Sequence, residues 1–239
     1  MSTSPTGKLL LDICEHTAVI TINNPPANTW DAESLIGLRQ IVSELNANRD
    51  IYALVITGSG DKFFSAGADL KMFASGDKAV AQDIGLKFGQ AFEALADFRG
   101  VSIAAVNGFA MGGGLECAMA CDIRIVERQA KLALPEAKVG LLPCAGGTQR
   151  LTALVGPGWA KRMILCGERI DAETAQRIGL AEEVDTGEAK SAAMNLAASV
   201  AAQSPVAVSF CKELIHEARD VVMPKGLILE RERFIQLFD

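Results

Sequence analysis

The chain has 239 residues, and 23 lysines and arginines against 29 aspartates and glutamates give a formal net charge of −6 at pH 7. With 49% hydrophobic and 22% charged residues, the composition is that of a globular protein and excludes a disordered chain. The acidic balance offers no basic footprint, so we expect neither nucleic acid nor a membrane surface as a partner. Six cysteines spread through a chain of this size do not form a disulfide scaffold, and we expect a cytoplasmic protein.

The N-terminal end and one long apolar stretch bear on targeting. Residues 1–8 contain neither a basic region nor an apolar run, so we expect a disordered lead and not a signal peptide. The apolar stretch 101–121 has the length of a membrane span, but it contains Glu116 and a glycine triplet at 112–114. A carboxylate is costly at membrane depth, and glycines weaken a helix by up to about 1 kcal/mol each. We therefore expect no transmembrane helix.

Strand and helix patterns alternate along the first part of the chain. The β-rich runs 9–13 and 18–22 predict a hairpin, and Asp31 stands where it can cap a helix with apolar residues at helical spacing up to Leu45. The further elements predicted here are strands over 52–57, 101–106, 123–126 and 131–134, and helices over 80–98 and from the glycine triplet onward. This alternation predicts an α/β fold.

From Ala145 onward the pattern is almost wholly helical. The predicted helices span 145–155, 157–167, 172–178, 187–203, 205–218 and 224–238. Gly156-Pro157-Gly158 is the nearest feature to a domain boundary, because glycine and proline interrupt helices. We expect the helices beyond it to pack over the sheet or to make contacts between subunits.

Three glycine-rich loops follow predicted strands, at 64–71, 107–116 and 142–148. None of them matches a phosphate-loop or dinucleotide-binding motif. The first two loops instead expose backbone N–H groups at strand-to-helix turns, and two such donors aimed at one point form an oxyanion hole. On spacing alone, glycines that only permit tight turns explain the pattern equally well.

Two acidic residues stand out because their surroundings are apolar. Glu116 follows the glycine triplet, and Glu136 follows the apolar segment 132–135. A buried carboxylate without a partner costs several kcal/mol, so each is either paired or functional. Two carboxylates in apolar surroundings can exchange protons near neutral pH. The alternative is that each pairs with an arginine, such as Arg124 or Arg150.

Other reactive side chains point to no further chemistry. Cys117 and Cys121 lie one helical turn apart with no histidine near them in sequence, so we expect packed thiols and no metal site. His16 and His216 are expected at the surface. No serine or cysteine stands beside a histidine in a nucleophile context, so triad chemistry has no support.

Taken together, the motifs resemble the enoyl-CoA hydratase/isomerase, or crotonase, superfamily. The matching stretches occur in family order over nearly the whole chain: NPPAN at 24–28, FSAGADLK at 64–71, AVNGFAMGGGLE at 105–116, LPE at 134–136 and GGTQRL at 146–151. The resemblance implies an α/β fold of the crotonase type, with a spiral core of repeated ββα units over residues 9–155. A C-terminal helical region for trimerisation or lid formation would follow over 156–239. Family members generally continue with one more segment, so we expect this region to be incomplete at its end.

The resemblance also implies a ligand and an assembly. The expected substrate is an acyl-CoA thioester, with no cofactor because coenzyme A is part of the substrate, and the expected assembly is a homotrimer or homohexamer. The implied substrate-binding residues are Ala27, Ala66, Ala68, Asp69, Leu70, Lys71, Gly113 and Cys144. Cys144 stands where the family usually has glycine, and we expect its thiol to be packed. Acyl-chain length stays open, because the family's pocket wall, here 72–83, varies freely.

The implied reaction follows from the positions that match the family's motifs. The backbone N–H groups of Ala68 and Gly113 match the oxyanion hole, and Glu116 and Glu136 match the two acids of enoyl-CoA hydratases. The resemblance therefore implies syn addition of water to a 2-trans-enoyl-CoA, giving a 3-hydroxyacyl-CoA. We assign the proton at C2 to Glu136 and the water to Glu116. The alternatives are a Δ3,Δ2-enoyl-CoA isomerase, which needs one acid, and a non-catalytic, RNA-binding protein of this fold.

Overall fold

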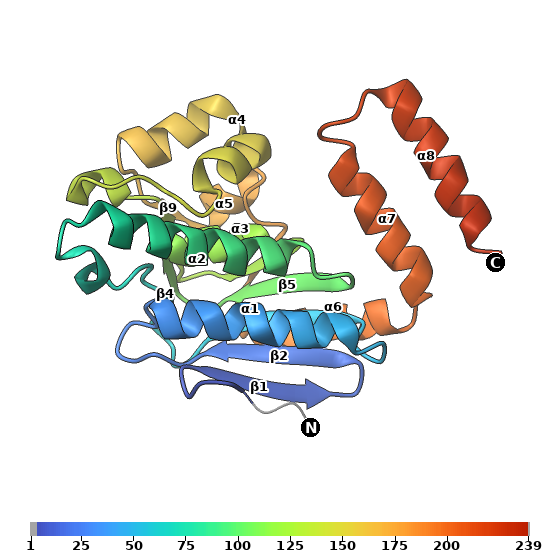
Figure 1. Cartoon of the computed structure of the whole chain (residues 1–239), viewed down its shortest axis with the longest axis horizontal. Helices are drawn as coiled ribbons and strands as arrows, with labels where there is room; N and C mark the ends of the chain where they lie inside the picture. The colour runs from blue at the N-terminus through green and yellow to red at the C-terminus, as the bar shows by residue number, and fades with distance from the viewer. Residues whose placement is uncertain (1–3, 239) are drawn as a thin grey trace.

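Two sheets carry the fold in the computed structural model, which describes residues 4–238 (Figure 1). The larger sheet has the order β1 (Leu9–Cys14), β2 (Thr17–Ile22), β3 (Ala53–Gly58), β5 (Val101–Val106), β7 (Ile123–Glu127) and β10 (Glu183–Asp185). The smaller sheet has the order β4 (Phe63–Ser65), β6 (Phe109–Met111), β8 (Lys131–Ala133) and β9 (Ile170–Asp171). The predicted hairpin is confirmed, since β1 and β2 pair antiparallel, and the other strands of the larger sheet pair in parallel.

A ββα unit repeats along the middle of the chain. The strands β3, β5 and β7 lie in the larger sheet, and the strands that follow them, β4, β6 and β8, lie in the smaller one. The helices α2 (Lys78–Ala96), α3 (Gly113–Ala120) and α4 (Gly147–Leu165) close the three units. This repeat confirms the predicted crotonase-type spiral. Of the smaller sheet, the strand predicted over 131–134 is confirmed as β8, whereas β4, β6 and β9 were not predicted, because two or three residues are too few to show an alternating pattern.

Alternation along the strands divides the core between the two faces of the larger sheet. Val55 and Ile103 pack on one face against α6 (Ala189–Ala201), whose buried residues are alanines. Ile56 and Val106 point to the opposite face, into the core shared with α1 (Ala32–Ala47), α2 and α3. The predicted N-cap is also confirmed, because the Asp31 side chain accepts a hydrogen bond from Ser34 N at 3.0 Å.

The N-terminal lead is described from residue 4, so the expected disorder of residues 1–3 lies outside the described part of the chain. Thr6 Oγ1 donates to Glu33 Oε1 at 2.5 Å, and Lys8 Nζ lies 2.5 Å from Asp31 Oδ2 and 2.8 Å from Glu33 Oε2. Residues 4–8 therefore lie against the start of α1, in contrast to the predicted disorder.

The region predicted as helical over 156–239 contributes more to the core than expected. Its strand β10 pairs with β7, and its helix α6 covers the larger sheet, so the core extends to about residue 201. The helix α5 (Ala172–Arg177) lies between β9 and β10. Gly156, with φ +75°, interrupts α4 close to the predicted boundary, but the chain continues into the same core.

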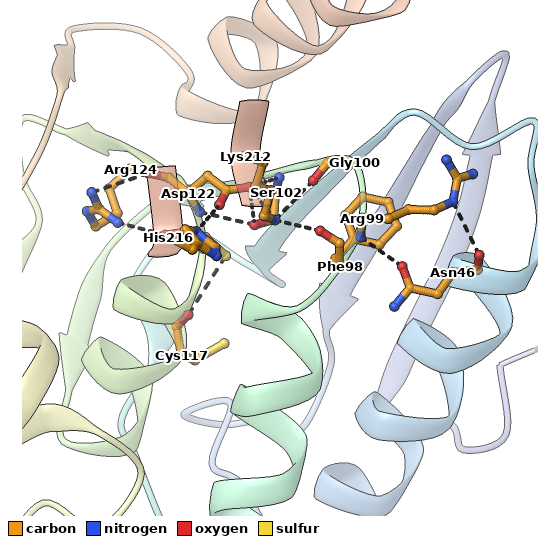
Figure 2. A network of polar contacts seen from close by, with 11 residues as sticks. Asn46, Phe98, Arg99, Gly100, Ser102, Cys117, Asp122, Arg124, Lys212 and His216 are labelled. Atoms are coloured by element: carbon orange, nitrogen blue, oxygen red, sulfur yellow. Dashed lines mark hydrogen bonds and ion pairs between the residues drawn. The ribbon is translucent and has the colours of Figure 1, made fainter. Parts of the chain in front are cut away.

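The helices α7 (Pro205–Glu217) and α8 (Met223–Gln236) form a hairpin beside the rest of the chain, and neither contains a buried residue (Figure 1). Figure 2 shows how α7 is attached. Lys212 Nζ donates to Phe98 O at 2.5 Å, to Gly100 O at 3.0 Å and to Asp122 Oδ2 at 2.8 Å. His216 Nε2 lies 3.4 Å from the other oxygen of Asp122.

No single helix within residues 4–238 is long and apolar enough to cross a membrane. By length and composition, α6 and α7 pass that test only when they are counted together, across a bend of 111°.

Candidate active site

A cavity of about 690 Å³ lies where the segments that follow β4, β6 and β8 come together. Its walls include both predicted acids and five of the predicted binding residues: Glu116, Glu136, Ala66, Ala68, Leu70, Gly113 and Cys144. The remaining wall comes from α2 and from the segment 138–142, together with Gly67, Phe73, Gly112, Pro135 and Arg169. The spiral therefore brings three loops that are far apart in sequence to one place.

Glu116 lies in the first turn of α3 and is 3% exposed. Its Oε1 accepts hydrogen bonds from Ala145 N and Gly147 N, both at 2.8 Å. Gly147 is the first residue of α4, so the carboxylate also faces the positive end of that helix dipole. Burial raises the pKa of Glu116, although the two hydrogen bonds and the positive charge of Arg150 oppose it.

The arginines considered as partners of the acids are bonded elsewhere. Arg150 Nη1 donates to Ala145 O at 3.0 Å, so it supports the loop that holds Glu116 without forming an ion pair with it. Arg124 Nη2 lies 2.5 Å from Glu182 Oε1. Within residues 4–238, neither acid has an arginine partner, so the alternative of arginine pairing is wrong.

Glu136 lies in the short 3-10 helix η2 (Glu136–Val139), and its carboxyl group, unlike that of Glu116, is not held by hydrogen bonds within residues 4–238. Both of its carboxylate oxygens are buried, and neither has a hydrogen-bond partner among the described residues. Burial, reinforced by the negative charge of Glu116 and opposed by the residue's own backbone N–H, raises the pKa of Glu136 to about 7. A carboxyl group with that pKa is a proton donor and acceptor near neutral pH.

The two amides predicted to form an oxyanion hole lie side by side. A Cβ added to Gly113 would lie 3.7 Å from Ala68 N, which shows how close the two backbones are. Trp30 N donates to Gly67 O and Asp69 N donates to Trp30 O, both at 2.8 Å, so Ala68 is held from both sides. Across residues 4–238, neither the Ala68 N–H nor the Gly113 N–H has a hydrogen-bond acceptor.

Three predicted binding residues do not line the cavity. Ala27 O accepts a hydrogen bond from Ala66 N at 2.9 Å, so Ala27 supports the loop from behind. The Asp69 side chain accepts from Lys71 N at 3.1 Å and caps the 3-10 helix η1 (Leu70–Phe73). Lys71 itself is exposed.

The cysteines of the site region differ in their surroundings. Cys144 is exposed on the cavity wall, so the expectation that its thiol is packed is wrong. Loss of solvation at the cavity wall, with the charges of Glu116 and Glu136, raises the pKa of this thiol to about 11, which leaves it protonated at neutral pH. Cys117 and Cys121 are buried as predicted. Within residues 4–238, no three His, Cys, Asp or Glu side chains are grouped to hold a metal ion.

Several residues that shape the site were not predicted. The amides of Ala145 and Gly147 hold Glu116, whereas the sequence drew attention to Cys144 in the same loop. The glycines at 146–147 marked this loop as a tight turn, but spacing does not show which N–H points inward. Phe88 and Gly85 on α2 also line the cavity. They carry no signal, because one face of any amphipathic helix is apolar.

Similarity to known proteins agrees with this site. A family profile described as enoyl-CoA hydratase/isomerase matches residues 12–239, and the chain belongs to that family. It is 37% identical to the short-chain-enoyl-CoA hydratase of Clostridium acetobutylicum, over 97% of this chain and 90% of the relative. It is 36% identical to the crotonyl-CoA hydratase of Syntrophomonas wolfei, over 95% and 88%. The chain is an enzyme of the hydratase type.

Solved structures show the same fold. DspI of Pseudomonas aeruginosa is 68% identical to this chain with a TM-score of 0.97, over 100% of this chain and 98% of that one. The enoyl-CoA hydratase of Bacillus anthracis is 34% identical with a TM-score of 0.92, over 95% and 89%.

Proposed function

We propose that this protein adds water to a 2-trans-enoyl-CoA in the syn sense, giving the 3-hydroxyacyl-CoA. One observation carries the proposal: two buried carboxyl groups share a cavity, one held by two amides and the other without any partner. Two unoccupied backbone N–H groups lie in the same cavity wall. Together they supply a base, an acid and a pair of donors for a developing oxyanion.

The unoccupied N–H groups of Ala68 and Gly113 would bind the thioester oxygen. Attack of water at C3 moves electrons through C2 onto that oxygen, so negative charge develops there as an enolate. Gly113 is the first residue of α3, and the positive end of the helix favours this charge. The loss of one donor of this kind typically lowers the rate by about 10²–10³-fold.

The different surroundings of the two acids support a division of roles. Glu116 accepts two hydrogen bonds through Oε1, which favours its charged form and leaves Oε2 for the water. As the water oxygen bonds to C3, Glu116 takes the released proton, and Glu136 gives its own proton to C2. The pair returns to its starting state when the proton on Glu116 passes back to Glu136, directly or through solvent.

The alternatives explain less of the site. An isomerase moves one proton between C2 and C4 and needs one acid, so the anchored Glu116 would have no role. A non-catalytic binding protein would gain nothing from the buried, partnerless Glu136, because burial without hydrogen bonds opposes folding.

Incubation with crotonyl-CoA tests the proposal, with absorbance of the conjugated enoyl thioester as the readout. Loss of absorbance together with formation of 3-hydroxybutyryl-CoA supports hydration. No change with any 2-enoyl-CoA overturns it, and a gain of absorbance from a 3-enoyl-CoA without hydration identifies an isomerase.

We also propose that the chain assembles as a homotrimer or homohexamer through α7 and α8. Six large apolar side chains on or beside these helices are more than 60% exposed: Ile215, Val222, Met223, Phe234, Ile235 and Phe238. Apolar surface of this extent is typical of a subunit contact. Sedimentation equilibrium measures the assembly, and a monomer at micromolar concentration would contradict it.

A further inference from the structure

The part of the cavity wall that α2 forms changes next to Gly113 from a large side chain, Phe88, to a residue without one, Gly85. Phe88 closes the wall beside the amide of Gly113, since a Cβ on Gly113 would lie 3.0 Å from Phe88 Cε1. Gly85, one turn nearer the start of α2, has no side chain, and a Cβ added there would meet nothing within 4 Å. Ala81 lies one further turn along the same wall. The helical rise makes the span from Phe88 to Ala81 about 10 Å.

The same cavity carries an unusual amount of exposed apolar surface. Leu70, Val139, Leu141 and Leu142 all line it, and they are 51%, 55%, 37% and 68% exposed. Exposed apolar side chains that are gathered in one hollow mark a binding surface, because apolar residues that are exposed without a binding role are usually scattered singly over the protein. The residues that α2 and η1 contribute are all uncharged: Leu70, Phe73, Ala81, Gly85 and Phe88.

We propose that the wall from Phe88 to Ala81 forms a groove for an unbranched acyl chain of medium length, and that Gly85 sets the length it accepts. This inference rests on the proposed function only in taking an acyl-CoA thioester as the ligand. Gly85 leaves open the space that any larger residue would occupy, so a chain that starts at the thioester can continue past Phe88 along the helix.

The chemistry of the wall favours hydrocarbon over the pantetheine arm of coenzyme A. The backbone groups of α2 are bonded within the helix, and its contributing side chains are apolar, so the amides of pantetheine would lose their hydrogen bonds there. A methylene group instead gains roughly fourfold in affinity when it is buried. The cationic lining residues, Lys138 and Arg169, come from other segments of the chain.

Binding of saturated acyl-CoAs tests the groove without any need for turnover. Calorimetry with butyryl-, hexanoyl-, octanoyl- and decanoyl-CoA should show Kd falling by roughly fourfold per added methylene until the groove is full. Gly85→Leu should reduce the ratio of butyryl to decanoyl Kd by about tenfold or more, because the side chain fills the groove.

Gly89→Leu is the matched control. Gly89 lies one turn further along α2, is not part of the cavity wall, and a Cβ there would lie 3.5 Å from Glu93 Oε1. Both changes replace a helical glycine with leucine, so both gain similar helix propensity. The Kd ratio of Gly89→Leu should match that of the wild type.

Two results would overturn this inference. One is a wild-type Kd that does not depend on acyl-chain length, and the other is a butyryl-to-decanoyl Kd ratio that is the same in Gly85→Leu and Gly89→Leu. The matching series of 2-enoyl-CoAs, assayed for hydration, separates this inference from the proposed function. Chain-dependent binding without hydration of any substrate would confirm the groove and overturn the hydratase proposal.

Discussion

Glu136 is a carboxyl group kept where its charged form is poorly solvated. Its two oxygens are buried without partners, and the negative charge of Glu116 disfavours its charged form further. Selection for stability alone would replace such a group or give it a partner, because a buried polar group without a hydrogen bond typically lowers the free energy of unfolding by about 1–3 kcal/mol. Its presence beside the amides of Ala68 and Gly113 therefore supports the proposed role in proton transfer.

We expect Glu136→Gln to lower the turnover of crotonyl-CoA by about 10²–10⁴-fold, because the amide is nearly the same shape but cannot donate the proton to C2. The affinity for butyryl-CoA should change little, since the lost interaction belongs to the transition state. Steady-state kinetics and calorimetry measure the two quantities. Near-normal turnover would remove Glu136 from the mechanism.

The same substitution should stabilise the protein at alkaline pH. Because the pKa of Glu136 is about 7 in the folded chain and 4.5 ordinarily, the folded state binds this proton more tightly. The free energy of unfolding therefore falls as pH rises from about 4.5 to about 7 and is level above that. Allowing for partial exposure, Glu136→Gln should be about 1–2 kcal/mol more stable than wild type at about pH 8.

Urea unfolding of both proteins at about pH 4 and about pH 8 checks this expectation. The two should have similar stabilities at the lower pH, where Glu136 is protonated in both states. An equal difference at both pH values would contradict the assigned pKa shift.

Glu116 and Glu136 should act as a unit. In Glu116→Gln the amide oxygen can still accept from Ala145 N and Gly147 N, so the loop stays in place while the charge is lost. We expect a fall in turnover similar to that of Glu136→Gln, and a double variant only slightly slower than either single one. Losses that multiply fully in a double-mutant cycle would show that the two acids work independently.

The glycine triplet at the start of α3 combines two different requirements. A Cβ on Gly114 would lie 2.3 Å from Ser65 O, a backbone atom, so this glycine is needed for packing. A Cβ on Gly113 would instead meet the ring of Phe88 at 3.0 Å, on the cavity side. One short helix therefore places a packing glycine directly after a glycine that faces the cavity.

We expect Gly113→Val to lower kcat by about 10²-fold or more, because the new side chain crowds the thioester beside the oxyanion donors. Displacement of Phe88 should cost about 1–3 kcal/mol of stability through overpacking. Gly114→Ala should instead destabilise the protein severely. Tm and kcat measured on one preparation decide the matter, and full activity in the folded fraction of Gly113→Val would exclude this role.

Lys212 makes three of the polar contacts that attach the C-terminal hairpin to the rest of the chain. Lys212 links α7 to the segment between α2 and β5 through the carbonyls of Phe98 and Gly100, and to the residue before β7 through Asp122 (Figure 2). Asp122 keeps Ser102 as a partner when Lys212 is removed, so the body of the protein stays intact. The hairpin is therefore a unit that can loosen separately from the core.

Lys212→Met should cost about 2–3 kcal/mol in the attachment of α7 and increase proteolysis of α7 and α8 relative to the core. Limited proteolysis with mass spectrometry locates the cuts. Lys225→Met, at an exposed position on α8, is the control and should leave the pattern unchanged. Equal protection in the two variants would show that other contacts hold the hairpin.

Patterns confined to a few neighbouring residues could be predicted from the sequence. The β1–β2 hairpin, the Asp31 cap and the helix after the glycine triplet each depend on residues close together in the sequence, so local composition determines them. The acids at 116 and 136 were also found this way, because an isolated charge in an apolar run has few explanations.

The properties that make the site reactive depend on residues far apart in the chain. Glu116 is held by amides 29 and 31 residues away, and Glu136 is without a partner because of how three loops meet. The pairing of β10 with β7 likewise extended the core beyond the boundary expected near residue 156. Burial, pKa and hydrogen-bond partners are set by packing between segments. A pattern along the chain can therefore identify an acid, but the folded surroundings decide whether it holds its proton.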